Sequence, residues 1–314
     1  MTGVERPDRR TLLAAAGVLA LSSQLACSRA RQRRFAELAR RRLGGTGREL
    51  PCLGLGGFPF GNVPDRSDGV AVVQRAWETG ARYFDTAPSY TQGESERRLG
   101  RGLAGLPREE LYVATKTLER DGDAALAELE QSLERLGMDY VDSVQVHELH
   151  GDLDAALAPG GVVPALLDAR ERGRVRHIGF SCHRDPGLAL EALARFEFAT
   201  ALVPVNPLDP QHRSFIRDVL PAARSKGVGV IAMKVFAGGQ LVKGPDRQPA
   251  GELVRFALSQ EGVCVAIPGA ASVREWDEAR EAAALGPLPP AEQEALRARV
   301  GTHEGKDSEW YKDA

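Results

Sequence analysis

The chain has 314 residues, of which 43% are hydrophobic and 27% are charged, and its formal net charge at pH 7 is −2. This composition is typical of a folded globular protein and excludes a fibrous or wholly disordered chain. The near-neutral charge gives no support to nucleic acid as a partner, because phosphate binding needs a basic surface. The length fits one large domain or two small ones.

The first 30 residues have the layout of an export signal. The pair Arg9-Arg10 leads into an apolar run at 12–21, and small residues follow around Cys27. This layout resembles a twin-arginine signal and predicts that the export machinery of that pathway is a partner, with the protein periplasmic or in the cell envelope. The run of about 10 residues is shorter than the ~20 of a spanning helix, so we expect no stable membrane span. Two alternatives remain open: a lipid anchor at Cys27, and an amphipathic N-terminal helix on a cytoplasmic protein.

After residue 40 the sequence alternates short apolar runs with segments of helical periodicity. A glycine-rich hairpin is predicted at 43–50. Eight candidate strands follow, at 53–57, 82–86, 111–116, 141–147, 175–181, 201–206, 228–234 and 263–268. The segments between them have helical spacing; leucines three to four residues apart between 126 and 136, for example, share one helix face that ends at Gly137.

Eight strand–helix units in a row predict an α/β fold, a single-domain (β/α)8 TIM barrel, which typically has about 250 residues. We place this barrel at residues 41–300 and a C-terminal tail at 301–314. A doubly wound open sheet is the rival fold, and it would need a GxGxxG turn after its first strand. The glycines at 54–57 do not make that pattern, because no phosphate-binding helix start follows them directly.

Four polar side chains occur where predicted strands end. Asp85 ends the second strand, Tyr90 lies five residues later, Lys116 ends the third strand and His147 ends the fourth. The carboxyl ends of barrel strands surround one mouth, where barrel enzymes carry their active sites. Each residue alone has an ordinary structural alternative, as a turn cap, a solvated lysine or a core histidine. Their occurrence together on consecutive strands favours an active site.

The segments around these four residues resemble the aldo-keto reductase family. The signature around the family's aspartate and tyrosine is similar to residues 84–90 (FDTAPSY) and 93–100 (GESERRLG). Further matches are Lys116 after its apolar strand, 141–147 (VDSVQVH), 178–181 (IGFS) and 265–269 (VAIPG). The resemblance covers residues 41 to about 281 and implies a barrel oxidoreductase.

In such an enzyme, reduction of a carbonyl needs a proton for oxygen and a hydride for carbon. Tyr90 is expected to be the proton donor. The pKa of a free phenol is near ~10, and we expect the Lys116 ammonium to lower it. Asp85 is expected to pair with Lys116, and His147 to bind the substrate oxygen. No metal is needed, and the cysteines at 27, 52, 182 and 264 form no CxxC motif.

The hydride must come from a cofactor, because no side chain can supply one. The resemblance implies a nicotinamide dinucleotide, and we expect NADP(H) rather than NAD(H), with Arg274 as the candidate partner of a 2′-phosphate. The expected cofactor-binding residues are Gly57, Phe58, Asp85, Ser181, Met233, Lys234, Val235, Gly269 and Glu278. Gly57 and Gly269 fit tight turns equally well. Three positions depart from the usual family pattern, namely Leu202, Met233 and Ala279.

The sequence therefore predicts an NAD(P)H-dependent oxidoreductase that reduces the carbonyl of a small molecule, an aldehyde, ketone or sugar, to an alcohol. The alternative is a barrel that binds or senses the nicotinamide cofactor with little turnover. A hydrolase or isomerase on the same fold would need a carboxylate pair, a metal cluster or a phosphate loop at the rim, and the sequence contains no such pattern.

Overall fold

The computed structural model describes residues 35–301 and 309–312. The chain divides into two compact units, Met1–Glu37 and Leu38–Ala314, and every described helix and strand lies in the second unit. The export signal predicted at 1–30, including Arg9-Arg10 and Cys27, lies outside the described residues.

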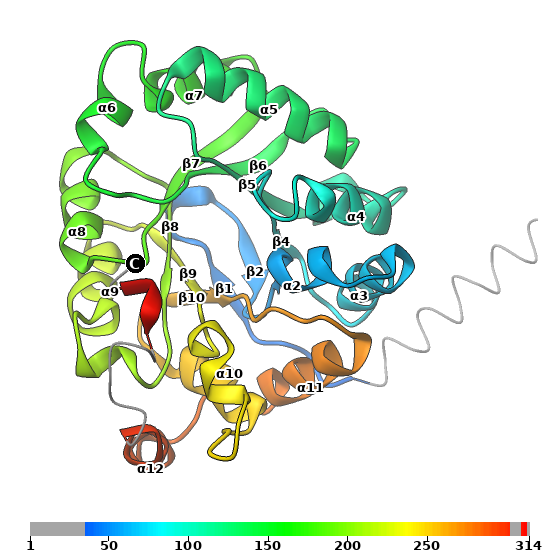
Figure 1. Ribbon diagram of the computed structural model, residues 1–314, viewed down its shortest axis with the longest axis vertical. Coiled ribbons are helices and arrows are strands. Elements are labelled where there is room, and N and C mark those ends of the chain that lie inside the picture. Colours follow the sequence, from blue (N-terminus) through cyan, green and yellow to red (C-terminus); the bar gives the residue numbers. More distant parts are fainter. Residues whose placement is uncertain (1–34, 302–308, 313–314) are drawn as a thin grey trace, which may run out of the picture. The chain divides into compact units, whose positions relative to one another are not determined.

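Eight parallel strands form the centre of the second unit (Figure 1). They are β3 (Leu55–Gly56), β4 (Tyr83–Asp85), β5 (Tyr112–Thr117), β6 (Val141–Val146), β7 (Val175–Ser181), β8 (Thr200–Pro204), β9 (Gly229–Met233) and β10 (Val263–Ala266). Each strand pairs with the next one along the chain, and parallel bridges from Leu53 to Ala266 and from Gly56 to Gly269 join the first strand to the last. The sheet therefore curls into a (β/α)8 barrel, as the sequence predicted.

Helices follow the strands and surround the barrel (Figure 1). The α-helices are α2 (Gly57–Asn62), α3 (Arg66–Glu78), α4 (Glu94–Leu103), α5 (Gly122–Leu136), α6 (Leu153–Leu157), α7 (Val162–Glu171), α8 (Pro186–Arg195), α9 (Phe215–Ser225), α10 (Ala250–Ser259), α11 (Val273–Ala284) and α12 (Pro290–Val300). In α5, the Asp121 side chain accepts the backbone N–H of Ala124, and Gly137 ends the helix with φ 65°. Leu129 and Leu133 are buried, so the predicted apolar face is confirmed.

A hairpin closes the barrel at the end where the strands begin. Its strands are β1 (Arg40–Arg42) and β2 (Glu49–Pro51), joined through the 3-10 turn η1 (Gly44–Thr46). Leu43 is fully buried in the barrel interior, and a Cβ on Gly44 would lie 2.3 Å from the backbone nitrogen of Gly229 at the start of β9. Chemistry that needs access to solvent is therefore confined to the opposite end.

A polar layer fills part of the barrel interior. Gln145 Nε2 donates to Ser143 Oγ at 3.1 Å and to Thr200 Oγ1 at 3.0 Å, and all three side chains are buried. A Cβ at residue 179 would lie 2.2 Å from Gln145 Oε1, so only glycine leaves room for this layer. Barrel interiors are usually filled with branched apolar side chains. Ser143, Gln145 and His147 share one face of β6 because side chains alternate along a strand, so the layer supports the mouth from below.

Within residues 35–301 and 309–312, no helix is long and apolar enough to cross a membrane. Over the same residues, three or more His, Cys, Asp or Glu side chains nowhere gather in a way that could hold a metal ion. Cys52, Cys182 and Cys264 have free thiols; the first two are buried and Cys264 is partly exposed.

Part of the predicted C-terminal tail packs onto the barrel. Trp310–Lys312 forms a 3-10 turn, η6, in which Tyr311 and Lys312 are buried. Figure 1 shows this red segment beside α9 and the ends of the strands. Two further 3-10 turns border it, η3 (Asp209–Gln211) after β8 and η4 (Ala237–Val242) after β9; another, η2 (Arg108–Glu110), precedes β5.

Candidate active site

Asp85, Tyr90, Lys116 and His147 converge at the end of the barrel where the strands finish. Asp85 is the last residue of β4, Lys116 is the last but one of β5, and His147 directly follows β6. Lys116 Nζ lies 2.6 Å from Asp85 Oδ2 and 4.6 Å from the centroid of the Tyr90 ring. The ring centroids of Tyr90 and His147 are 6.2 Å apart. The structure thus brings the four predicted residues into one cluster.

The loop that follows Tyr90 has an unusual backbone. Thr91, Gln92 and Gly93 have φ values of 50°, 54° and 78°, in the left-handed region that residues other than glycine rarely adopt. Backbone strain of this kind is concentrated at functional sites. The Tyr90 ring contacts Phe58 edge to face, with centroids 5.4 Å apart. The loop therefore presents the Tyr90 ring between Phe58 and the rest of the cluster.

The Asp85–Lys116 ion pair is buried, with side-chain exposures of 3% and 1%. Lys116 Nζ also donates to the Thr86 carbonyl at 2.7 Å, so one of its three N–H bonds remains beyond these two partners. Burial raises the pKa of Asp85, and the Lys116 ammonium opposes that rise. Burial lowers the pKa of Lys116, but Asp85 and Tyr90 more than compensate and hold it above its ordinary value. Lys116 is therefore a charged ammonium beside the Tyr90 ring at neutral pH.

The pKa of Tyr90 departs from the expectation. Burial raises it, the Lys116 ammonium lowers it, and the Asp85 carboxylate raises it again; the net direction is upward. Lys116 thus acts in the expected direction, but burial has the larger effect. Loss of solvent around the phenolate outweighs the nearby positive charge, and the depth of burial cannot be read from the sequence.

His147 is a neutral imidazole. Burial lowers its pKa well below the ordinary value, and the positive charges of Lys116 and Arg120 act in the same direction. Its backbone is held at both ends, because its N–H donates to the Thr117 carbonyl at 2.8 Å and its carbonyl accepts from Arg120 at 3.1 Å. Its Nδ1 is buried and has no hydrogen-bond partner within the described part of the chain. A neutral imidazole can donate one hydrogen bond to an oxygen at the mouth.

Two buried polar atoms at the mouth test whether a nicotinamide cofactor fits. Ser181 ends β7, and its hydroxyl has no partner among residues 35–301 and 309–312. The Oδ1 atom of Asp85 is likewise buried without a hydrogen-bond partner among these residues. A buried polar group without a partner costs about 1–3 kcal/mol, so such atoms favour a ligand with complementary groups. The amide of a nicotinamide ring has both a donor and an acceptor, and the site fits it.

Gly57 and Gly269 are required for close packing, and neither is a left-handed turn residue. A Cβ on Gly57, directly after β3, would lie 2.3 Å from the Asp85 carbonyl oxygen. A Cβ on Gly269, after β10, would lie 2.4 Å from Pro59 Cγ. These glycines let the start of α2 approach both β4 and the loop after β10. Glycine is needed at these two positions because neighbouring atoms at the rim leave no room for a Cβ. A tight turn does not explain them.

The other predicted cofactor residues fall in two places. Met233 ends β9, and Lys234 and Val235 follow it at the mouth, with Lys234 in a left-handed conformation of φ 51°. Burial lowers the pKa of Lys234. Glu278 lies on α11, where it pairs with Arg274 at 3.4 Å, and both side chains are largely exposed. Arg274 thus has a carboxylate beside it at the position where a 2′-phosphate was expected.

The departures from the family pattern have ordinary packing roles. Leu202 is 1% exposed in the apolar part of the barrel interior, and Met233 packs against the same cluster. Ala279 lies on α11, is 3% exposed and packs into the outer core. These positions therefore add no polar group to the mouth.

Sequence reasoning missed a second group of side chains around Lys234. Its Nζ lies 5.1 Å and 5.3 Å from the ring centroids of Trp310 and Tyr311. The Tyr311 ring is 6.2 Å from that of His183, whose Nε2 lies 2.9 Å from Glu148 Oε2. Glu148 and His183 could have been found from the sequence, because each lies two residues after a strand. Trp310 and Tyr311 could not, because they are far from these strands along the chain.

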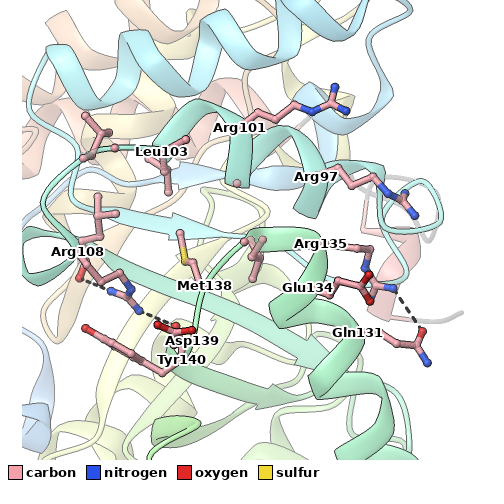
Figure 2. Close-up of a pocket in the computed structure, with 17 residues that line it drawn as sticks. Arg97, Arg101, Leu103, Arg108, Gln131, Glu134, Arg135, Met138, Asp139 and Tyr140 are labelled. Atoms are coloured by element: carbon pink, nitrogen blue, oxygen red, sulfur yellow. Dashed lines mark hydrogen bonds between the residues drawn. The ribbon is translucent and has the colours of Figure 1, made fainter.

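A pocket of about 760 Å³ lies away from this mouth, between α4, α5 and the turn before β6. Figure 2 shows Met138 near its middle, with Arg97, Arg108 and Arg135 around it. Arg108 pairs with Asp142 and Arg135 with Glu96, so both have structural partners. The residues that line this pocket reach the start of β6, whereas His147 follows its other end. They include no predicted site residue.

The barrel and the charged, aromatic cluster at its mouth define the class of barrel enzymes with an acid–base site at the strand ends. A model of the aldo/keto reductase family matches residues 52–252. The chain belongs to the aldo/keto reductase family, whose members are oxidoreductases that use nicotinamide cofactors.

Individual relatives agree with this assignment. The chain is 33% identical over 239 residues to L-galactose dehydrogenase of Arabidopsis thaliana, covering 69% of this chain and 72% of that protein. It is 32% identical over 232 residues to D-threo-aldose 1-dehydrogenase of a Pseudomonas species, covering 63% and 69%. In structure it resembles an aldo-keto reductase from Bacillus halodurans in its holo form, with a TM-score of 0.72, 22% identity and coverage of 84% and 96%.

Proposed function

We propose that this protein interconverts a small-molecule carbonyl and the corresponding alcohol with a nicotinamide cofactor, and that Tyr90 is the acid in the reducing direction. The observation that carries the proposal is the placement of the Lys116 ammonium, paired with Asp85, against the Tyr90 ring. A phenol that transfers a proton needs its phenolate stabilised, and a fixed buried ammonium provides that stabilisation.

Each residue of the cluster has a distinct role in this proposal. Tyr90 donates a proton to the carbonyl oxygen, or accepts one from the alcohol when the reaction runs in reverse. Lys116 lowers the energy of the phenolate, and Asp85 holds Lys116 in place and offsets the cost of burying its charge. Neutral His147 donates a hydrogen bond to the same oxygen and orients it.

The cofactor supplies the hydride when bound. Ser181 would hold the nicotinamide amide through its unpartnered hydroxyl, with Gly57, Phe58 and Met233 bordering the ring. Lys234 and Val235 would follow the phosphates, and Gly269 and Glu278 would border the adenosine end. NADP(H) is the cofactor we propose, on the strength of Arg274, which is exposed on the first turn of α11.

The substrate class we propose is a sugar or other aldehyde or ketone. Two relatives are named as dehydrogenases of L-galactose and of D-threo-aldoses. Hydroxyl groups of such substrates need polar partners at a mouth. The neutral His147 and the nearby His183–Glu148 pair offer such partners.

A fluorescence titration with NADPH and NADH, followed by a panel of carbonyls and sugars, tests the proposal. We expect saturable binding of at least one cofactor and turnover of at least one aldose or aldehyde. Tighter binding of NADPH than of NADH would agree with the role of Arg274, and Arg274→Ala should then remove the difference. Cofactor binding with no turnover across the panel would favour a binding or sensing barrel, and no binding at all would contradict the proposal.

Export by the twin-arginine pathway is a second proposal, and it rests on the sequence alone. Arg9-Arg10 precedes the apolar run at 12–21, and that pathway carries folded proteins. A folded barrel could then take its cofactor with it. The cofactor would have to be regenerated where the protein functions, by a second substrate of opposite oxidation state.

Replacing Arg9-Arg10 with Lys-Lys tests the export proposal. We expect the variant to stay in the cytoplasm, where fractionation and immunoblotting would detect it, while the parent chain is found in the envelope fraction. Cys27→Ser is the matched variant for a lipid anchor, and it should change membrane association without blocking export. Unchanged export of the Lys-Lys chain would rule out the twin-arginine route.

A further inference from the structure

The C-terminal residues 309–312 form a clasp, by which we mean Glu309, Trp310, Tyr311 and Lys312. Lys312 is its anchor. Its Nζ donates to Glu309 Oε2 at 2.8 Å, to Asp209 Oδ1 at 3.0 Å and to the His212 carbonyl at 2.7 Å, and its side chain is fully buried. A lysine is almost never buried without such partners. The clasp is therefore a specific docked element of the fold.

The anchor joins a residue that already organises the loop after β8. Asp209 accepts hydrogen bonds from Ser214 Oγ at 2.8 Å and from the backbone N–H groups of Phe215 and Ile216 at 3.0 Å and 2.8 Å, at the start of α9. Its carboxylate thus fixes both the first turn of a helix and the anchor lysine. Movement of the clasp and movement of this loop are coupled through one buried charge.

Tyr311 makes the second attachment. Its hydroxyl donates to Glu309 Oε1 at 2.7 Å and accepts from Asn206 Nδ2 at 2.8 Å. The same Asn206 nitrogen donates to the Lys234 carbonyl at 3.2 Å. One amide therefore links the clasp to the backbone at the end of β9, where Lys234 is held in a left-handed conformation.

Trp310 covers the same segment from outside. Its ring centroid lies 5.1 Å from Lys234 Nζ, and a Cβ on Gly238 would lie 3.0 Å from its indole nitrogen. The clasp therefore contacts Lys234 at the end of β9 and Gly238 four residues later. Lys234 is one of the residues proposed above to follow the phosphates of the cofactor.

We propose that the clasp is a positioning element for the cofactor, which holds the segment 234–238 in its binding conformation and sets how long the nicotinamide dinucleotide stays bound. This inference rests on the proposed cofactor function of that segment. Tyr311 and Lys312 act through Asn206 and Asp209, and they leave the acid–base chemistry at Tyr90 unchanged. A long residence time would also serve a protein that takes its cofactor through export.

Stopped-flow measurement of NADPH release tests the clasp. The full-length protein is loaded with NADPH and mixed with excess NADP+, and the loss of cofactor fluorescence gives the dissociation rate. Tyr311→Phe keeps the ring and loses both hydroxyl bonds, so release should accelerate by about threefold to tenfold, the effect of one or two hydrogen bonds. Lys312→Met should accelerate release by more than about tenfold, because it leaves two buried carboxylates without their cation.

Matched controls separate positioning from general destabilisation. Lys226→Met removes an exposed lysine at the end of α9, and Tyr140→Phe removes a hydroxyl at the far end of the barrel; both should release NADPH at the parent rate. Single-turnover hydride transfer from preloaded enzyme should be unchanged in Tyr311→Phe. A lower melting temperature with an unchanged release rate in that variant would overturn the inference, even if Lys312→Met fails to fold. Failure of the parent protein to bind any nicotinamide would instead overturn the proposed function.

Discussion

Tyr90→Phe should reduce carbonyl turnover by about 10²–10⁴-fold, the usual contribution of a general acid, while cofactor binding is retained. The substitution removes the phenolic hydroxyl alone. The ring can keep its edge-to-face contact with Phe58 and its place beside Lys116 Nζ. Steady-state kinetics with a carbonyl substrate, combined with a NADPH fluorescence titration, would separate the chemical step from binding.

A tyrosine outside the site gives the control for this variant. Tyr140 lies before β6, against Arg108 and Arg176, and Tyr140→Phe should leave turnover at the parent level. If Tyr90→Phe kept parent turnover, another group would have to supply the proton. His147 in its imidazolium form would then be the next candidate, and since its pKa is lowered, that activity should be confined to low pH and lost in His147→Ala, Tyr90→Phe.

Lys116→Met should lower the rate and also move the pH profile to higher pH. Reduction requires protonated Tyr90, so it declines as pH rises through the pKa of that residue. The Lys116 ammonium lowers this pKa against the larger effect of burial. Removing the charge takes away the effect that opposes burial, so the pKa of Tyr90 rises further. The alkaline limb of reduction should therefore move upward, and alcohol oxidation, which needs the phenolate, should begin at higher pH.

The same substitution should weaken the fold, because it leaves Asp85 buried without its partner. Breaking a buried ion pair in this way costs about 3–5 kcal/mol of stability. The double variant Lys116→Met, Asp85→Asn should recover part of that stability while keeping the displaced pH profile. Urea unfolding of both variants, alongside Lys226→Met, would measure the two effects separately. A parent-like pH profile in a folded Lys116→Met protein would contradict the assigned role of Lys116.

Much of the architecture was predictable from local patterns. Each of the eight barrel strands overlaps a short apolar run, and helices such as α5 begin at a capping aspartate and end at a glycine. The order of eight such units predicts a barrel, because parallel strands joined by helices bury both faces of a sheet. The four site residues could be found from the same patterns, since strand ends in a barrel share one mouth.

Electrostatic properties of the site needed the tertiary structure. From the sequence, Lys116 was expected to lower the pKa of Tyr90, but burial turns the net direction upward. The reason is that desolvation depends on everything packed around the phenol, including Phe58 and His147, which come from different loops. The same holds for the neutral state of His147, which depends mainly on burial.

The sequence by itself determined the order of strands and helices, the family and the positions of Asp85, Tyr90, Lys116 and His147, because these depend on spacing along the chain. Only the tertiary structure decided how they act together and what surrounds them. The clasp is the clearest case, since Lys312 meets Asp209 across about 100 positions of chain. Contacts at such a separation leave no local pattern, because they form only when the whole barrel has closed.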